Sequence, residues 1–249
     1  MDGATKSATF KQDATGHWYV TLVVAFTMPD VALPAPDPAT AVGIDLGLKD
    51  FAVLSTGEKI AAPRFYRKGE RKIRRAARTV SRKQRGSHNR DKARQRLARV
   101  HRRIAQQRQD FLHQLSTRLV REYDIICLED LAVKALGRTN LGKSIHDVGW
   151  GAFRRMLEYK ALWQRQRIIV ISRWYPSSKR CGYCGAVYAD LTLAERTWTC
   201  ATCQTTHDRD LNAAANIRAE GLLLLAQGLG ESLNGCGSSC QTADGGRGR

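Results

Sequence analysis

The chain contains no apolar run long enough to cross a membrane. A transmembrane helix needs about 20 consecutive apolar residues, and the leucine patch at 222–225 is only a short one. Residues 1–7 also lack the apolar core of a secretory signal. We therefore expect a soluble protein that works in the cytoplasm, has reduced cysteines and has no membrane partner.

Acidic residues are scarce in one segment of the chain. Between positions 64 and 108 there are 19 Lys and Arg but only two acids, Glu70 and Asp91, so this segment holds nearly all of the net charge of +18. Apolar residues recur at helical spacing in this segment and beyond it. This periodicity disfavours a disordered basic arm and predicts two long helices joined by a turn near 86–89.

A basic stretch of this kind is either a solvated helical face or a surface that binds phosphates. A solvated face usually mixes acids with bases, and this one hardly does, so nucleic acid is the favoured partner. The candidate contacts are basic residues of the two predicted helices: Arg71, Lys72, Arg74, Arg75, Arg78, Arg82, Lys83, Arg94, Arg99 and Arg103.

Prolines are few as well, and four of the six lie between positions 29 and 38, where they predict a linker. Before it, residues 5–27 alternate around a turn at 13–16, which is typical of a β-hairpin. After it, the pattern predicts strands at 42–47, 51–54, 59–61, 125–128 and 167–172, the basic helices, a loop at 137–149, and helices at 150–166 and 208–227. Three antiparallel strands followed by strands linked through crossovers predict a mixed α/β sheet of the ribonuclease H-like kind.

Four of the seven cysteines have the spacing of a metal site. They read Cys-x2-Cys-x15-Cys-x2-Cys, a pattern in which two knuckles can meet around one tetrahedral Zn²⁺. The predicted zinc ligands are Cys181, Cys184, Cys200 and Cys203. Of the remaining three, Cys127 lies in an apolar run and is expected in the core, whereas Cys236 and Cys240 lie in a Gly/Ser-rich tail and indicate nothing.

Three acidic residues lie where predicted elements would bring them together. Asp45 shares one face of its strand with Gly43 and Gly47, which we interpret as room for a metal ion that a phosphate also approaches. Glu129 ends the fourth strand, at the carboxyl edge where open α/β sheets place their sites. Asp210 falls in the first turn of the last helix.

The start of that last helix has two acidic residues. Asp208 is expected to be the N-cap, and the small Ala213 and Ala214 let the helix pack close to the sheet. For either aspartate alone, interaction with the helix dipole is an equally good explanation. Three converging carboxylates instead favour two Mg²⁺ ions and phosphodiester hydrolysis. We expect His207 to be near the zinc or on the surface and not to act as a general base.

Five motifs in order resemble the TnpB family of transposon-encoded proteins, which are related to type V CRISPR effectors. They are the stretches at 41–47, 126–131, 148–157, 177–185 and 208–214. The resemblance implies a RuvC-like core with a zinc ribbon, and RNA-guided cleavage of target DNA with a guide RNA made from the transposon end. It also implies that Asp45, Glu129 and Asp210 are the catalytic carboxylates that hold two Mg²⁺ ions, and that the four cysteines hold a structural Zn²⁺.

The front of the chain departs from this family. Its members begin with a wedge-like β-barrel interrupted by a helical recognition domain, and this chain starts at the last strands of the wedge. We expect a wedge hairpin remnant and linker at 1–38, a nuclease core at 39–178 and 207–230 with basic helices at 64–122, a zinc ribbon at 179–206, and a disordered tail at 231–249. Two alternatives stay open: a non-catalytic nucleic-acid-binding remnant and an unguided structure-selective nuclease.

Overall fold

The computed structural model describes residues 4–25, 37–132, 135, 137–139, 142–192 and 194–228. Its centre is a five-stranded sheet in the order β5-β4-β3-β6-β7. The strands are β3 (Ala41–Leu46), β4 (Asp50–Leu54), β5 (Lys59–Ala61), β6 (Ile125–Glu129) and β7 (Arg167–Ile171). β3, β4 and β5 pair antiparallel, whereas β3, β6 and β7 pair parallel, so the predicted mixed α/β sheet is confirmed.

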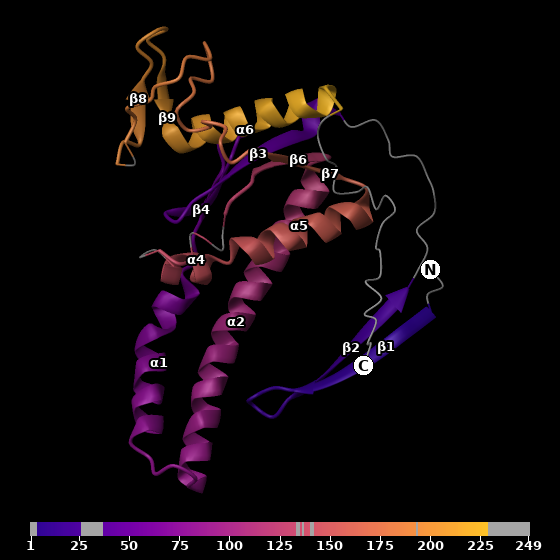
Figure 1. Ribbon diagram of the computed structural model, residues 1–249, viewed down its shortest axis with the longest axis vertical. Helices are drawn as coiled ribbons and strands as arrows, with labels where there is room; N and C mark the ends of the chain where they lie inside the picture. The colour runs from indigo at the N-terminus through magenta and orange to yellow at the C-terminus, as the bar shows by residue number, and fades with distance from the viewer. Residues whose placement is uncertain are drawn as a thin grey trace, which may run out of the picture.

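Helices cover both faces of the sheet. Helix α6 (Arg209–Ala226) lies on one face, and α2 (His88–Glu122) and α5 (Trp150–Gln164) lie on the other (Figure 1). Side chains alternate between the faces as the period of a strand requires. Toward α6 point Ala41, Ile125, Cys127, Ile169 and Ile171, and toward α2 and α5 point Val42, Ile44, Ile126, Leu128 and Ile168. The predicted core position of Cys127 is therefore confirmed.

Helix α6 packs against β3 without a side chain between the two backbones. A Cβ atom at Gly43 would overlap the carbonyl oxygen of Ala214 and lie 2.6 Å from the backbone nitrogen of Arg218. Ala213 and Ala214 are buried in the same contact, as their small size predicted. The interpretation of Gly43 was wrong in one respect: the space beside it holds the helix and leaves no room for a phosphate there.

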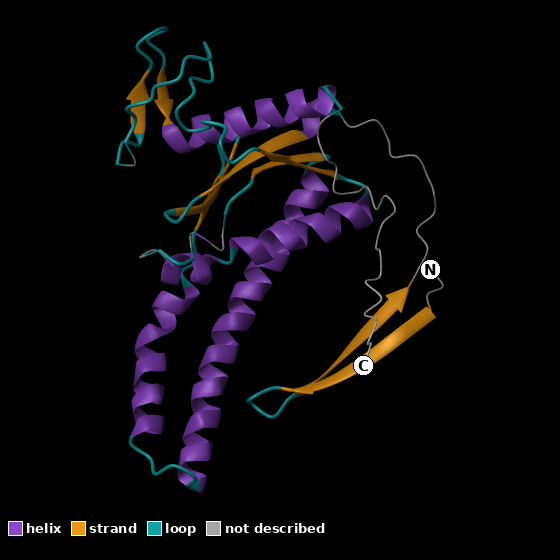
Figure 2. Cartoon of the chain, viewed as in Figure 1, coloured by secondary structure: helices purple, strands orange, loops and turns teal. Residues whose placement is uncertain are grey.

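The basic segment forms a helical hairpin that projects from the sheet (Figure 2). α1 (Phe65–Ser81) and α2 are separate helices joined by a turn, as predicted, and Ser87 caps α2 by accepting a hydrogen bond from the backbone of Arg90 at 3.2 Å. α2 is continuous over 35 residues. Its last turns bury Leu112, Leu115 and Leu119 against the sheet, so one rigid helix joins the basic arm to the core.

The start of α1 is capped by a residue from far along the chain. Arg64 precedes the helix in the left-handed region (φ 52°) and makes no side-chain cap. The buried carboxylate of Asp147 instead accepts hydrogen bonds from the backbone nitrogens of Tyr66 (2.8 Å) and Arg67 (3.4 Å). Asp147 therefore caps the N-terminus of α1, although it lies on another segment of the chain.

Asp147 lies on α4 (Gly142–Val148), which corrects the prediction of a loop at 137–149. Glycines suggested the loop, but Gly142 is needed for close packing, because a Cβ atom there would overlap the carbonyl oxygen of Gly137. A helix of seven residues is too short to show a periodic pattern. The remaining predicted helices, α5 and α6, are present with ends shifted by one or two residues.

The N-terminal hairpin lies apart from the sheet. β1 (Ala4–Gln12) and β2 (Trp18–Ala25) pair antiparallel, as predicted, and both are exposed along their length. The hairpin tip meets α2 at Arg102, which pairs with Asp13 (3.6 Å) and contacts His17. Most of the predicted linker and the predicted tail with Cys236 and Cys240 lie outside the described residues. No helix in the described ranges is long and apolar enough to cross a membrane.

The close contact between α6 and β3 can be tested by adding one methyl group. Gly43→Ala should lower the free energy of unfolding by about 3 kcal/mol, because the new atom meets helix backbone that cannot move alone. Urea unfolding followed by circular dichroism measures this change. The control is Gly86→Asn, at a left-handed position with open space. Asn tolerates this conformation better than most residues, so the loss should stay below about 1 kcal/mol. Equal stability of Gly43→Ala and the parent would contradict the packing.

Candidate active site and metal centre

The three predicted carboxylates meet at one edge of the sheet. Asp45 lies near the end of β3, Glu129 is the last residue of β6, and Asp210 is in the first turn of α6. Because β3 and β6 are parallel, their carboxyl ends share that edge, and α6 begins above it. Asp208 caps α6 by accepting hydrogen bonds from the backbone of Asp210 and Leu211, both at 3.1 Å, so its predicted role is confirmed.

The carboxylates influence one another electrostatically. Burial raises the pKa of Asp45 from its ordinary value of 3.8 to about 7, and the negative charges of Asp210 and Glu129 add to this rise. Burial also raises the pKa of Glu129, with a smaller contribution from Asp130. Raised values at neighbouring acids are typical of sites that bind cations or transfer protons.

The carboxylates are not packed around a single point. Among the described residues, the only three or more Cys, His, Asp or Glu side chains with ligand atoms all within 4.8 Å of one another are the four cysteines. The oxygens of Asp45, Glu129 and Asp210 are therefore more widely spaced than that limit. Neighbouring Asp130 is engaged elsewhere, since it pairs with Arg154 at 3.0 Å and with Arg173.

Arg196 is a site residue that the sequence did not indicate. Its Nη1 donates to both carboxylate oxygens of Asp210, at 3.1 and 3.2 Å, and its backbone carbonyl accepts from the backbone nitrogen of Arg209 at 2.8 Å. Arg196 lies between the two cysteine pairs, with no motif around it. Only the folded chain brings it to Asp210.

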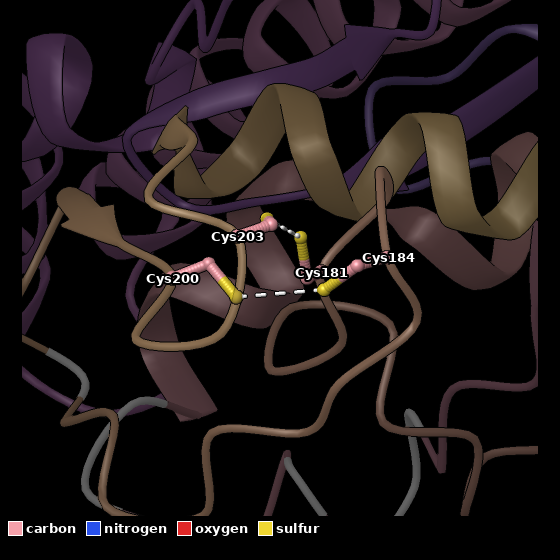
Figure 3. Close-up of side chains that lie close together, drawn as sticks. All are labelled: Cys181, Cys184, Cys200 and Cys203. Atoms are coloured by element: carbon pink, nitrogen blue, oxygen red, sulfur yellow. Dashed lines mark hydrogen bonds between the residues drawn. The ribbon is translucent and has the colours of Figure 1, made fainter.

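The four cysteines converge from two knuckles (Figure 3). The Sγ atoms of Cys181 and Cys203 are 3.6 Å apart, and those of Cys184 and Cys200 are also 3.6 Å apart. β8 (Thr197–Thr199) and β9 (Thr206–Asp208) pair antiparallel on either side of the second knuckle. The quartet can hold a metal ion, as its spacing predicted.

His207 lies against this quartet and not at the carboxylates. Its Nε2 is 3.1 Å from the Sγ of Cys181, and its ring is 4.9 Å from that of Trp198. This agrees with the expectation that His207 would lie near the cysteines. Because β9 leads directly into α6, the quartet is joined to the helix that carries Asp210.

Two buried asparagines make a second connection between the cysteine module and α6. The side-chain oxygen of Asn212 accepts from the backbone nitrogen of Gly182 at 3.0 Å, and its Nδ2 donates to the carbonyl of Arg180 at 2.7 Å. Asn216 donates to the carbonyls of Ser177 (2.8 Å) and Arg180 (2.7 Å). The first knuckle is thus held on α6 by hydrogen bonds. The second knuckle is connected to α6 covalently, because β9 follows it and leads directly into that helix.

The predicted nucleic-acid contacts divide over several surfaces of the basic arm. Arg71, Arg74, Arg75, Arg78 and Arg82 line a hollow of about 650 Å³ along α1. Lys72, Arg99 and Arg103 line another of about 520 Å³ between α1 and α2. Arg94 lines a third beside the hairpin tip, and Lys83 lies in the turn, where its carbonyl accepts from Arg90 at 3.3 Å. The ten residues therefore form no single continuous face.

Comparison with known proteins identifies two family matches. Residues 22–140 match the family OrfB_IS605, described as "Probable transposase", and residues 150–217 match the "Cas12f1-like, TNB domain". The second match covers the cysteine quartet, Arg196 and Asp210.

Two curated relatives and one solved structure are similar to the chain. A "Putative RNA-guided DNA endonuclease" of Streptomyces pristinaespiralis is 48% identical over 225 residues, which cover 90% of this chain and 55% of the relative. "Putative RNA-guided DNA endonuclease InsQ" of Escherichia coli (strain K12) is 32% identical over 244 residues, covering 92% and 60%. The protein in "Cryo-EM structure of the Cas12f1-sgRNA-target DNA complex" has a similar fold, with a TM-score of 0.54, 15% identity, and coverage of 84% of this chain and 55% of that one.

The raised pKa of Asp45 predicts a stability change in the absence of divalent cations. The pKa is about 7 in the folded chain and ordinarily 3.8. The ionised carboxylate of Asp45 therefore lowers the free energy of unfolding increasingly as the pH rises from about 4 to 7. Asp45→Asn, which cannot ionise, should therefore unfold at higher urea concentration. The gain should be small near pH 4 and on the order of 3 kcal/mol at pH 8. A gain that is equal at pH 5 and pH 8 would contradict the assignment.

Proposed function

The chain belongs to the TnpB family of transposon-encoded proteins, and on that premise we propose that it is the nuclease part of an RNA-guided DNA endonuclease. Asp45, Glu129 and Asp210 form the catalytic set. The observation that carries this proposal is that the three carboxylates lie at one edge of the sheet, where the charges of Glu129 and Asp210 both act on the partly buried carboxyl of Asp45. The chain spans 55% and 60% of the length of the two relatives above, so guided cutting is proposed for it in the context of the whole protein.

We propose the domain division that the sequence predicted. Residues 39–178 and 207–230 form a RuvC-like core, a member of the ribonuclease H-like class, with the basic helices at 64–122 inserted. Its support is the strand order β5-β4-β3-β6-β7 with three antiparallel strands and two further parallel ones. Residues 179–206 are the zinc ribbon, and 1–38 are a hairpin and linker from a wedge-like barrel. The exposed apolar side chains of β2, such as Trp18 and Leu22, support that last assignment.

The donor set of the carboxylates fits Mg²⁺, which prefers hard oxygen ligands and keeps several waters. Oxygens bound to one Mg²⁺ at about 2.1 Å lie within about 4.2 Å of each other. Since the three carboxylates are spaced more widely than 4.8 Å as a group, the set fits two ions better than one. A bound pair of Mg²⁺ ions supplies Lewis-acid activation of water and of the leaving oxygen in phosphodiester hydrolysis.

The chain's own residues set the protonation and the orientation of this site. Because its pKa is about 7, the carboxyl of Asp45 is partly protonated near pH 7 when no cation is bound. A cation that binds there would replace this proton. Arg196 fixes both oxygens of Asp210 and supplies a positive charge beside it. The side chain of Arg196 is 53% exposed, so its guanidinium can also meet an anionic strand at this edge.

We propose Zn²⁺ as the metal of the cysteine quartet, with a structural role. Four thiolates without a water position are typical of structural zinc. The quartet is joined to α6 by β9 and by the hydrogen bonds of Asn212 and Asn216, so a bound ion braces the helix that carries Asp210. The zinc takes no part in the reaction.

We propose a guide RNA from the transposon end and target DNA as the partners. The names of the two relatives support this assignment, and so does the similar fold of Cas12f1 in its complex with sgRNA and target DNA. The basic arm supplies the charge that either nucleic acid requires. A binding protein without nuclease activity is the second candidate, favoured by the ion pair of Arg196 with Asp210, which neutralises one member of the carboxylate set.

Cleavage by the chain co-expressed with its RNA, and by a version extended upstream in frame, tests the function. Cutting should require Mg²⁺, and Asp45→Asn should reduce it by about 1,000-fold or more, since it removes a ligand from the reacting centre. Asp50→Asn, on the adjacent strand and outside the set, is the matched control and should cut like the parent.

Unchanged cutting by Asp45→Asn would refute the carboxylate assignment. Salt-sensitive RNA binding without cleavage under any divalent metal would select the non-catalytic candidate. Cleavage of branched DNA without RNA would select an unguided nuclease.

The bracing role of zinc gives a separate prediction. Cys200→Ser should release zinc and reduce cleavage, whereas Asn212→Ala should keep the four thiolates and the zinc but still reduce cleavage, by loosening α6. A colorimetric chelator assay measures the zinc, and Mg²⁺-dependent cutting measures the activity. Thr202→Ala, an exposed position within the second knuckle, is the control for both. An intact protein that binds no zinc would contradict this role.

A further inference from the structure

A hollow next to Asp210 has no ligand in the function proposed above. Its volume is about 390 Å³. It is lined by residues that follow β3, by residues at the start of α1, by α4 and by Arg196. Its charged lining residues are Lys49, Arg64, Arg67, Asp147 and Arg196. We refer to it as the Lys49 pocket.

The charge of the Lys49 pocket is not balanced within the protein. Four of the five charged side chains are cationic, and the fifth, Asp147, already accepts two backbone hydrogen bonds as the cap of α1. Neither Lys49 nor Arg64 has an ion pair or side-chain hydrogen bond within the described ranges. Arg67 donates to the hydroxyl of Ser144 at 3.2 Å. Arg196 is paired with Asp210, whereas Lys49, Arg64 and Arg67 have no ion pair in the described part of the chain. Three cations gathered without a paired counter-charge repel one another, so the arrangement is suited to an anion.

Two shared residues connect the Lys49 pocket to its surroundings. Arg196 lines it and also holds Asp210, so the pocket adjoins the carboxylate set. Arg67 lines both the pocket and the 650 Å³ hollow along α1. Along that helix, arginines recur every three or four residues, which is about every 4.5–6 Å. The single acid in that hollow, Glu70, is paired with Arg74 and Lys143.

We propose that the Lys49 pocket binds the phosphodiester backbone of a single strand immediately beside the phosphate that is cut, and that the hollow along α1 carries the strand onward. The proposal rests on the proposed nuclease function for its orientation, although binding itself does not require cutting. A cavity of this size matches small-ligand pockets and has room for one phosphate with its sugar.

The double variant Lys49→Gln/Arg64→Gln tests the pocket by binding alone. This variant and its control both carry Asp45→Asn in the full-length, zinc-loaded chain, so that nothing is cut. Fluorescence anisotropy with a labelled single strand of about 12 nucleotides, as DNA and as RNA of the same sequence, measures affinity over a range of KCl concentrations. Loss of two phosphate contacts should reduce the slope of log affinity against log salt by about 1.4, and the affinity at about 100 mM salt by about 10-fold.

The charge-matched control is Lys6→Gln/Lys11→Gln on the exposed hairpin, which removes the same net charge away from the pocket. Its slope should stay that of the parent. The thermal unfolding temperature should not fall in Lys49→Gln/Arg64→Gln, because neither side chain forms an ion pair or side-chain hydrogen bond in the described part of the chain.

An equal loss on DNA and RNA would mean that the pocket reads only phosphate, and a loss on DNA alone would assign it to the target strand. Both outcomes support the proposal. A loss on RNA alone would assign the pocket to the guide and overturn it, as would an unchanged slope or an equal change in the control.

The two proposals fail separately. If Lys49→Gln/Arg64→Gln reduces the salt slope but no version of the protein cuts DNA, strand binding by the Lys49 pocket stands and the nuclease function is refuted. Asp45-dependent cutting with an unchanged slope refutes only the pocket.

Discussion

The contact between the backbones of α6 and β3 is the constraint on which the site depends. Helix α6 can approach this strand only because residue 43 has no side chain, and the small Ala213 and Ala214 complete the fit. Arg218 then ties the helix to the start of the strand by donating to the carbonyls of Ala41 and Pro38, both at 2.9 Å. This packing sets the distance from which the charge of Asp210 acts on Asp45. A larger separation would weaken the electrostatic coupling between the two carboxyls.

Bringing three carboxyl groups to one partly buried edge is unfavourable without cations, and two basic side chains near the start of α6 oppose that repulsion. Arg196 neutralises Asp210 from one side, and Lys59 on β5 pairs with the cap residue Asp208 at 2.6 Å from another. Asn212 holds the first knuckle to the same helix. The cysteine quartet is therefore linked to the position of the Asp210 carboxylate, because the hydrogen bonds of Asn212 and Asn216 join its first knuckle to the first two turns of α6.

Local patterns in the sequence predicted most of this fold and could not predict the contacts that orient it. The apolar run around Cys127 predicted its place in the core, and the Cys-x2-Cys spacing predicted the quartet, since both depend on residues close along the chain. Asp147 caps α1 by accepting from backbone nitrogens 80 and 81 residues earlier, and Arg196 reaches Asp210 across 14 residues. Such pairs leave no periodic signal. The sequence showed that Gly43 leaves space on one face of its strand, but it could not show that the backbone of α6 occupies this space.

The basic arm and the carboxylates are joined through packed secondary structure. α2 runs without interruption from the arm into the core, and Asp147 fixes the start of α1 against α4. The cations of α1 are thereby tied to the core that carries Asp45. For the proposed nuclease, cations placed in advance in this way would lower the entropic cost of bringing a phosphate to the carboxylates. Phosphate contacts position a nucleic acid without reading its sequence, so in that function the choice of strand would depend on which strand reaches this edge of the sheet.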